Sequence, residues 1–489
     1  MPELAPDHST PALTTAPPTP QDSERSGPAN ETGPVNESGP LKQGESNAPL
    51  GTTRELVTLA WPLVLSNLAY TAVGFTDTLY MGRLGVLEVG AVGLASLVLF
   101  TVSLFFRGAL NAAATFVARA LGAGDPAGVR RWAGIFLTLS LVGLPLAVVG
   151  PWLVSTVLNL LGAAPSILQV AQTYGHIRIF EIPFVLLGAA SVAIMLGLGN
   201  TRTPMLLSWL LVVVNAALAA LFVFGFHWGV AGAAWATLIA VVMQGLLSYA
   251  LLLRLYRTDT GPFPFVRPDL RELRLVGRIA LPAGATDLAD VGAFTAFLGV
   301  IARLGPTELA ASQIANQFAS FGFLPAFALS ASTSSLLSRA LGAGEPGLAR
   351  RIGWRGAALA AGWMLVLTLI FLLWPRPLIA LFNSDPDVLK LGTTVLAVMS
   401  GYLLFDGIGI ALGGALGGAG DTRFRLLVTL GGAWLVMVPA ATWLAPRYGV
   451  GGAWAAALLY IVVLAGSYTW RFWSGRWYKP KDSLLSAAD

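Results

Sequence analysis

Apolar residues fill most of the chain between residues 55 and 473, in long runs that short polar or glycine-rich connectors separate. The runs 135–157 and 205–226 contain no charged residue. An apolar run of about 20 residues is long enough to cross the hydrocarbon core of a bilayer as an α-helix. The pattern predicts twelve such helices, near residues 55–81, 88–116, 132–158, 168–197, 204–226, 230–255, 276–302, 308–338, 352–381, 388–417, 424–445 and 450–473.

The chain repeats itself with an offset of 220 residues. The segment 118–126 reads Ala-Arg-Ala-Leu-Gly-Ala-Gly-Asp-Pro, and 338–346 reads Ser-Arg-Ala-Leu-Gly-Ala-Gly-Glu-Pro. The segment 199–202 returns one residue further on, at 420–423. Matching hydrophobic halves are typical of transporters that move one half against the other. We therefore predict an all-α membrane protein with twelve transmembrane helices in two pseudo-symmetric six-helix lobes.

The same pattern divides the chain into segments. We expect an N-terminal lobe over residues 51–256 and a C-terminal lobe over 276–475, joined by a proline-containing linker at 257–275. Residues 1–50 are rich in Pro, Ser, Thr, Gly and Glu and hold few large apolar side chains. Such a segment cannot bury enough apolar surface to fold, so we expect a disordered tail. Residues 476–489 form a second, shorter tail.

Composition supports a membrane protein and orients it. Hydrophobic residues make up 55% of the chain and charged residues 11%, which excludes an ordinary soluble domain. There is no cysteine. The formal net charge of +5 is small and concentrated in the connectors, so it does not indicate a nucleic-acid partner. Alternate connectors hold most of the Arg and Lys, at 119–131, 202, 254–274, 339–355, 423–425 and 476–481. The positive-inside rule then places both termini in the cytoplasm. Arg far outnumbers Lys, beside abundant Ala and Gly, so we expect a bacterial chain in the inner membrane.

Carboxylates inside the predicted helices are the main candidates for function. A charged group at bilayer depth is costly unless it faces water or a partner. Asp77 shares one helical face with Asn67 and Tyr70, and the repeat places Asp287 and Asp290 on the matching stripe of helix seven. The other acids are Glu181 in helix four and Asp406 in helix ten, and helix eight adds the amides Gln313 and Asn316.

Each of these acids also has a purely structural interpretation. Asp77 could lie at the membrane interface, and Asp287 could pair with a neighbouring polar group. Glu181 could pair with Arg178, which lies three residues away on the same helical face. For Asp290 and Asp406, no residue nearby in the sequence neutralises the charge.

Several short motifs, taken together and in order, make the chain resemble the multidrug and toxic compound extrusion (MATE) family over about residues 54–475. They are Ala60-Trp61-Pro62, Thr76-Asp77 before Met81-Gly82-Arg83-Leu84-Gly85, the two Leu-Gly-Ala-Gly connectors, and the segments 197–204, 228–234 and 417–422. The resemblance implies two six-helix lobes around a central cavity that opens alternately to each side. It also implies export of cationic or amphipathic compounds, driven by entry of Na⁺ or H⁺.

The resemblance also assigns roles to single residues. Asp77 lies where the family has its acid in helix one. Asp290 and Asp406 are similar to the acids of helices seven and ten in the NorM branch, although Glu is usual at the first. Asn215 resembles the Asn of an Asn-x-x-x-Asp pattern in the DinF branch, but the Asp of that pattern is Ala219 here. This departure favours a coupling site in the C-terminal lobe.

We therefore expect Asp290 and Asp406 to bind the coupling ion, either H⁺ or Na⁺ with these two as metal ligands. Neighbours would be Gln313, Asn316 and Asp287. In the N-terminal lobe, the residues expected to hold a proton or substrate are Asp77, Tyr70, Asn67, Glu181 and Asn215. We expect no cofactor, and a monomer whose partners are small cationic or amphipathic substrates and membrane lipid. Alternatives are a flippase for lipid-linked precursors and a membrane-embedded enzyme, but the chain lacks His-Glu-x-x-His and Gly-x-Ser-x-Gly motifs.

Overall fold

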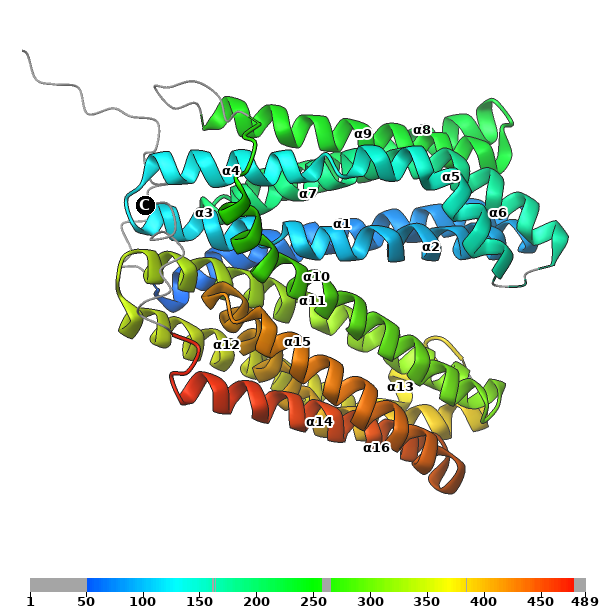
Figure 1. Cartoon of the computed structure of the whole chain (residues 1–489). Coiled ribbons are helices and arrows are strands. Elements are labelled where there is room, and N and C mark those ends of the chain that lie inside the picture. The colour runs from blue at the N-terminus through cyan, green and yellow to red at the C-terminus, as the bar shows by residue number, and fades with distance from the viewer. Residues whose placement is uncertain (1–50, 161, 163, 257–264, 384, 479–489) are drawn as a thin grey trace, which may run out of the picture. The chain divides into compact units, whose positions relative to one another are not determined.

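The computed structural model describes residues 51–160, 162, 164–256, 265–383 and 385–478. The tail predicted at 1–50, and most of the one at 476–489, lie outside these ranges. Every regular element in the described ranges is helical (Figure 1). The elements are α1 Thr53–Leu84, α2 Val86–Leu110, α3 Ala113–Gly122, α4 Pro126–Ser140, α5 Gly143–Leu160, α6 Pro165–Arg178, η1 Ile179–Glu181, α7 Ile182–Gly197, α8 Arg202–Ala220, η2 Leu221–Gly225, α9 Gly229–Leu255, α10 Leu270–Ala302, α11 Pro306–Gly342, α12 Pro346–Leu373, α13 Pro375–Ala380, α14 Pro386–Ala419, α15 Thr422–Gly431, η3 Gly432–Met437 and α16 Val438–Trp473.

The predicted number of membrane-crossing helices is confirmed. Eleven helical stretches among the described residues are long and apolar enough to span a bilayer. The last of these, Thr422–Trp473, is broken at Gly449, whose φ of 62° and ψ of −150° are not helical. Its counterpart 220 residues earlier, Gly229, also has a positive φ, of 55°. With this break counted, the described residues contain six spans in each half.

The break at Gly449 predicts a specific loss of stability. Its φ and ψ lie in a region that only glycine adopts easily, so Gly449→Ala should cost about 1–3 kcal/mol. The space around a Cβ atom there is open, so the loss would come from backbone strain alone. Gly466, in the regular part of α16, also has open space around it, and Gly466→Ala should be neutral or slightly stabilising. Melting temperatures of the two variants in detergent test the difference.

Each half of the chain builds its own hydrophobic core. The core of the N-terminal half includes Phe116, Phe136 and Tyr174, and that of the C-terminal half includes Trp454 and Phe472. Figure 1 shows the corresponding helices as two bundles, α1–α9 in one and α11–α16 in the other. The two-lobe architecture is thus the one that the internal repeat predicts.

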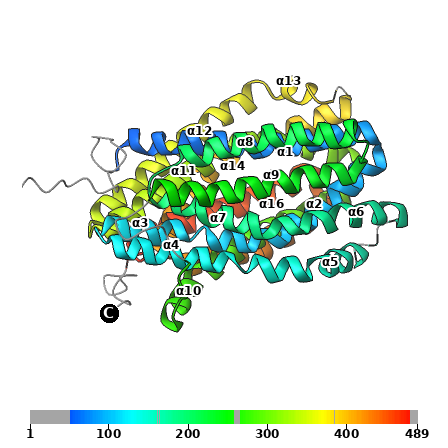
Figure 2. The same cartoon turned by 90° about the horizontal axis from the view of Figure 1, so that it is seen from above.

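The first helix of each half crosses from one core to the other. Leu56, at the start of α1, belongs to the core of the C-terminal half, whereas Met81, near its end, belongs to that of the N-terminal half. α10 does the reverse, with Ile279 in the N-terminal core and Phe297 in the C-terminal core. The lobes therefore exchange the beginnings of two helices related by the repeat. The views in Figures 1 and 2 both place the start of α10 beside α4.

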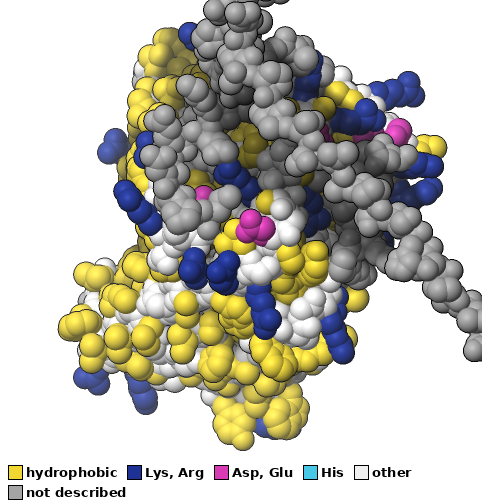
Figure 3. All heavy atoms as spheres, turned by 90° about the vertical axis from the view of Figure 1, so that its left-hand side faces the viewer, with side chains coloured by type: hydrophobic (Ala, Val, Ile, Leu, Met, Phe, Trp, Pro, Cys, Tyr) yellow, Lys and Arg dark blue, Asp and Glu magenta, His cyan; other side chains and the backbone are white. Residues whose placement is uncertain are grey.

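One end of the helices is rich in positive charge. This end holds the connectors between α3 and α4 and between α11 and α12, and it faces the viewer in Figure 3. Among its visible charged side chains, Lys and Arg predominate over Asp and Glu. We call it the connector end.

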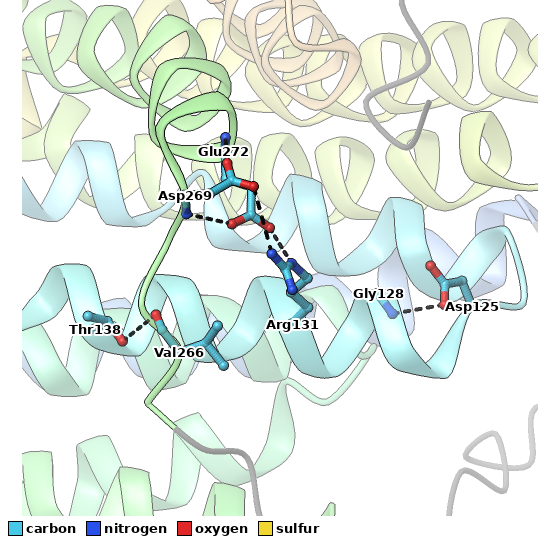
Figure 4. Close-up of polar contacts among 7 residues, drawn as sticks. All are labelled: Asp125, Gly128, Arg131, Thr138, Val266, Asp269 and Glu272. Atoms are coloured by element: carbon cyan, nitrogen blue, oxygen red, sulfur yellow. Dashed lines mark hydrogen bonds and ion pairs between the residues drawn. The ribbon is translucent and has the colours of Figure 1, made fainter. Parts of the chain in front are cut away.

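The described end of the linker, residues 265–269, is hydrogen bonded to the N-terminal lobe before α10 begins (Figure 4). The Thr138 hydroxyl on α4 donates a hydrogen bond to the Val266 carbonyl at 2.9 Å, and the Val266 amide donates to the Gly134 carbonyl at 3.3 Å. Asp269 and Glu272 form a capping box at the start of α10, and Arg131 of α4 forms an ion pair with Glu272. This cap explains why α10 begins at Leu270, six residues before the predicted start at 276.

Candidate functional site

A cavity of about 500 Å³ lies within the N-terminal lobe, between α1, α2, α6, α7 and α9. This volume suits a drug-sized molecule, because such pockets range from about 300 to 1,000 Å³. Much of the lining is apolar, with Phe100, Phe184 and Val241 among the contributing residues. The ionisable residues of the lining other than tyrosine are Asp77, Arg107, Arg178 and Glu181.

Asp77 contributes an unsatisfied acceptor to this cavity. It lies on α1 beside Asn215 of α8 and Thr237 of α9. The Asn215 amide nitrogen donates to the Thr237 hydroxyl at 2.9 Å. Among the described residues, neither the Asp77 Oδ1 atom nor the Asn215 Oδ1 atom has a hydrogen-bond partner, although both are buried. A buried acceptor without a donor is costly, so this corner of the cavity suits a proton or a cation.

Glu181 is neutralised within the protein, as its structural interpretation requires. Arg178 donates two hydrogen bonds to its carboxylate, of 2.9 and 2.7 Å. A third bond, of 2.9 Å, joins the same guanidinium to the Tyr174 hydroxyl. The pair therefore brings no net charge to the cavity, and Asp77 and Arg107 are the ionisable residues of its lining that remain, tyrosine aside.

The other two polar residues predicted for this lobe differ in position. Tyr70 lines the cavity, and its hydroxyl accepts a hydrogen bond from Gln244 of α9 at 3.1 Å. Asn67 does not line the cavity, although it lies one helical turn from Tyr70. Its backbone carbonyl accepts a hydrogen bond from the Thr71 hydroxyl at 3.1 Å, which is a contact within α1.

The structure brings Asp290 and Asp406 together in the C-terminal lobe. Asp290 lies on α10 with an exposed side chain, and it accepts a hydrogen bond from the Tyr460 hydroxyl of α16 at 3.0 Å. Asp406 lies on α14, where it is 8% exposed. The two carboxylates are close enough for their charges to interact. No ion pair within 4.0 Å joins either of them to a basic side chain in the described ranges.

Asp287 lies between the lobes. Its carboxylate packs against Gly108 of α2, within electrostatic range of Arg107 and Arg425. On the same contact, Gly284 of α10 lies against the Phe105 carbonyl of α2. Asp287 therefore connects the C-terminal pair of carboxylates to the opposite lobe.

The two remaining candidates of the C-terminal lobe are the amides of α11. Gln313 is exposed and Asn316 is half-buried. Neither side chain is hydrogen bonded to Asp290 or Asp406 within the described part of the chain. The described residues also hold no group of three His, Cys, Asp or Glu side chains that could bind a metal ion.

The MatE family model matches this chain twice, over residues 62–221 and 282–443. The two matches start 220 residues apart, as do the repeated motifs. This chain belongs to the MATE family. Each match covers most of the first five spans of its half and leaves out the sixth, α9 in one half and the end of α16 in the other.

Similar MATE proteins and structures cover nearly the whole chain. The probable multidrug resistance protein NorM of Brucella suis is 30% identical over 445 residues, which is 86% of this chain and 93% of that protein. The Deinococcus radiodurans protein of the same description is 31% identical, over 86% of this chain and 96% of that protein. The bent form of the Vibrio cholerae MATE transporter VcmN has a TM-score of 0.79 at 22% identity, and covers 87% of this chain and 98% of that one. A Pyrococcus furiosus transporter of the MOP superfamily scores 0.78 at 20% identity, covering 87% and 97%.

Three contacts of this MATE protein were missed by the sequence analysis. Tyr460 and Thr237 lie in apolar helices without a distinguishing motif, so only the fold shows that they reach Asp290 and Asn215. Arg425 was assigned to a connector, but it lies on α15 and its guanidinium reaches Gly417 of α14. An Arg within one helical turn of a predicted helix start could have been treated as partly inside the membrane.

Proposed function

We propose that this MATE protein is a cation-coupled antiporter that exports cationic or amphipathic compounds by alternating access. The observation that carries the proposal is the pair Asp290 and Asp406, two carboxylates within electrostatic range of each other that form no ion pair with a basic side chain of the described residues. Two acids placed together repel one another unless a proton or a metal ion lies between them. The cavity of the N-terminal lobe supplies a separate place for substrate.

The coupling site in this proposal is built around Asp290. Its Oδ1 atom accepts a hydrogen bond from the Tyr460 hydroxyl, and in this proposal its second oxygen would bind the entering cation. Asp406 supplies the second carboxylate, and Asp287 extends the acidic stripe toward the N-terminal lobe. Gln313 and Asn316 would complete a Na⁺ shell only if α11 turned them toward the acids. Proton binding needs no such rearrangement.

The substrate site in this proposal is the N-terminal cavity. Its apolar walls suit the body of an amphipathic molecule, and Asp77 suits a cationic group. Because Glu181 is paired with Arg178, Asp77 is the carboxylate available to a ligand there. The relatives from Brucella and Deinococcus are described as probable multidrug resistance proteins, which supports a broad substrate range.

Asp77→Asn should separate charged from neutral ligands. The variant keeps the size of the side chain and removes its negative charge, so the affinity for a cationic dye should fall about tenfold, equivalent to about 1.4 kcal/mol. A neutral amphipathic dye should bind almost as before. Fluorescence titration of purified protein in detergent measures both. Equal losses for the two dyes would argue for a structural role of Asp77.

A flippase for pyrophosphate-linked lipids is the weaker candidate. Such a ligand needs an excess of positive charge, but the two arginines of the cavity are matched by two acids.

The connector end, with its basic side chains, suits the cytoplasmic face of a bacterial inner membrane. This orientation would place the start of α1 and the end of α16 inside the cell. We expect the protein to act as a monomer.

Reconstitution into liposomes tests the proposed function. A Na⁺ gradient and a H⁺ gradient are imposed separately, and movement of a cationic dye is followed with each. We expect at least one gradient to drive dye against its concentration difference. If neither gradient drives the dye while an undecaprenyl-type lipid is translocated, the flippase is the better description.

A further inference from the structure

The repeated connector motif marks a contact between the lobes that the proposed function does not explain. The helices α3 and α11 end at Gly122 and Gly342, the two equivalent glycines of that motif. A Cβ atom on Gly122 would overlap the Arg339 carbonyl oxygen, and would lie 2.8 Å from its carbonyl carbon and 3.0 Å from its Cα atom. A Cβ atom on Gly342 would meet Arg119 at the same two distances. The backbones thus touch reciprocally about a local two-fold axis.

Space, rather than backbone conformation, requires glycine at these two positions. The turns after both helices are made by Gly124 and Gly344, whose φ angles are 67° and 74°. Gly122 and Gly342 are helical, and alanine is ordinarily the better residue in a helix. Small residues at such a crossing allow two helix backbones to approach closely.

Two further hydrogen bonds flank the glycines and also cross between the lobes. The Arg119 guanidinium of α3 donates to the Ala419 carbonyl at the end of α14, at 3.3 Å. The Ser335 hydroxyl of α11 donates to the Leu196 carbonyl near the end of α7, at 2.9 Å. Arg119 is 7% exposed and Ser335 4% exposed, so the contact is closed to solvent.

We propose that the Gly122–Gly342 crossing is the closure contact of the connector end. The lobes meet there backbone to backbone, and this end opens only when the two glycines separate. A methyl group on either glycine would hold the lobes apart and shift the population toward the state that is open at this end. The inference rests on the proposed alternating access, but its test does not require transport.

The chain has no cysteine, so one introduced thiol reports on this contact. In a Ser335→Cys background, a membrane-impermeant maleimide should label the thiol slowly, because the position is buried. Adding Gly122→Ala or Gly342→Ala should raise the labelling rate about fivefold or more, as expected for a shift of about 1 kcal/mol between the two states. The labelling rate of the variant with both alanines should be little higher than that of either single variant, because one methyl group already separates the lobes.

Gly347→Ala is the matched control. This glycine lies in the first turn of α12, next to the same connector, and a Cβ atom there would have no neighbour within 4 Å. Its labelling rate should not change. If the double-alanine variant is labelled no faster than this control, the proposal is wrong.

Arg119→Gln covers the case in which the alanine variants fold poorly. It removes the hydrogen bond to Ala419 without adding volume at the crossing, so it should raise the labelling rate of the introduced thiol, as the alanine variants do. Unchanged labelling in this variant, in protein that elutes as a single species, would also overturn the proposal. Failure of dye transport in the unmodified protein, with the labelling pattern intact, would count against the proposed function alone.

Discussion

Asp290→Asn and Asp406→Asn should each reduce ion-driven export at least about tenfold, because each removes one of two negative charges from the proposed coupling site. Asparagine can still accept the hydrogen bond from Tyr460, so Asp290→Asn tests the charge rather than the packing. Proteoliposome assays at matched protein amounts measure the effect under each ion gradient. Calorimetric titration of the coupling ion should show the same loss.

Asp387→Asn provides a control with the same chemical change. Asp387 is exposed in the first turn of α14, away from both lobes' internal acids, so transport should be unaffected. Normal export by both Asp290→Asn and Asp406→Asn would remove the coupling site from the C-terminal lobe. Asp77 and Asn215, whose Oδ1 atoms have no hydrogen-bond partner among the described residues, would then be the next candidates.

Arg178→Gln should destabilise the protein by about 3–5 kcal/mol, the usual loss when a buried ion pair is broken on one side. Glu181 is 5% exposed and depends on Arg178 for its charge balance. The melting temperature in detergent should fall clearly.

Adding Glu181→Gln to this variant should recover most of the loss. Two glutamines can still form hydrogen bonds with each other, and no buried charge remains without a partner. The double variant therefore distinguishes a charge effect from lost packing. Equal melting temperatures for the single and double variants would show that Glu181 does not depend on Arg178.

The sequence was sufficient for the spans and the two-lobe fold, because both depend on patterns along the chain. Length and hydropathy locate a helix such as α9, predicted at 230–255 and found at Gly229–Leu255. The offset of 220 residues assigns one half of the helices to each lobe. The acid of the first repeated connector, Asp125, caps α4 by accepting a hydrogen bond from the Gly128 amide at 2.8 Å.

The partners of the candidate site could be predicted only in part. The Arg178–Glu181 pair follows from helical spacing, because three residues separate them on one face. The contact from Tyr460 to Asp290 joins residues 170 positions apart, and no local rule selects one hydroxyl among many. The exchange of the starts of α1 and α10 between the lobes could not be predicted either, because an apolar stripe on a helix does not determine which of two cores it packs into.

That exchange bears on how the protein is made. When only the first half has been synthesised, the C-terminal core into which Leu56 packs does not yet exist. The surface beside α4 that the start of α10 covers is also still uncovered. Neither half is complete until the other arrives, so we expect fragments cut within the linker to be recovered as stable membrane proteins only when they are expressed together. Biogenesis would then end with a single joint assembly step rather than with two independent ones.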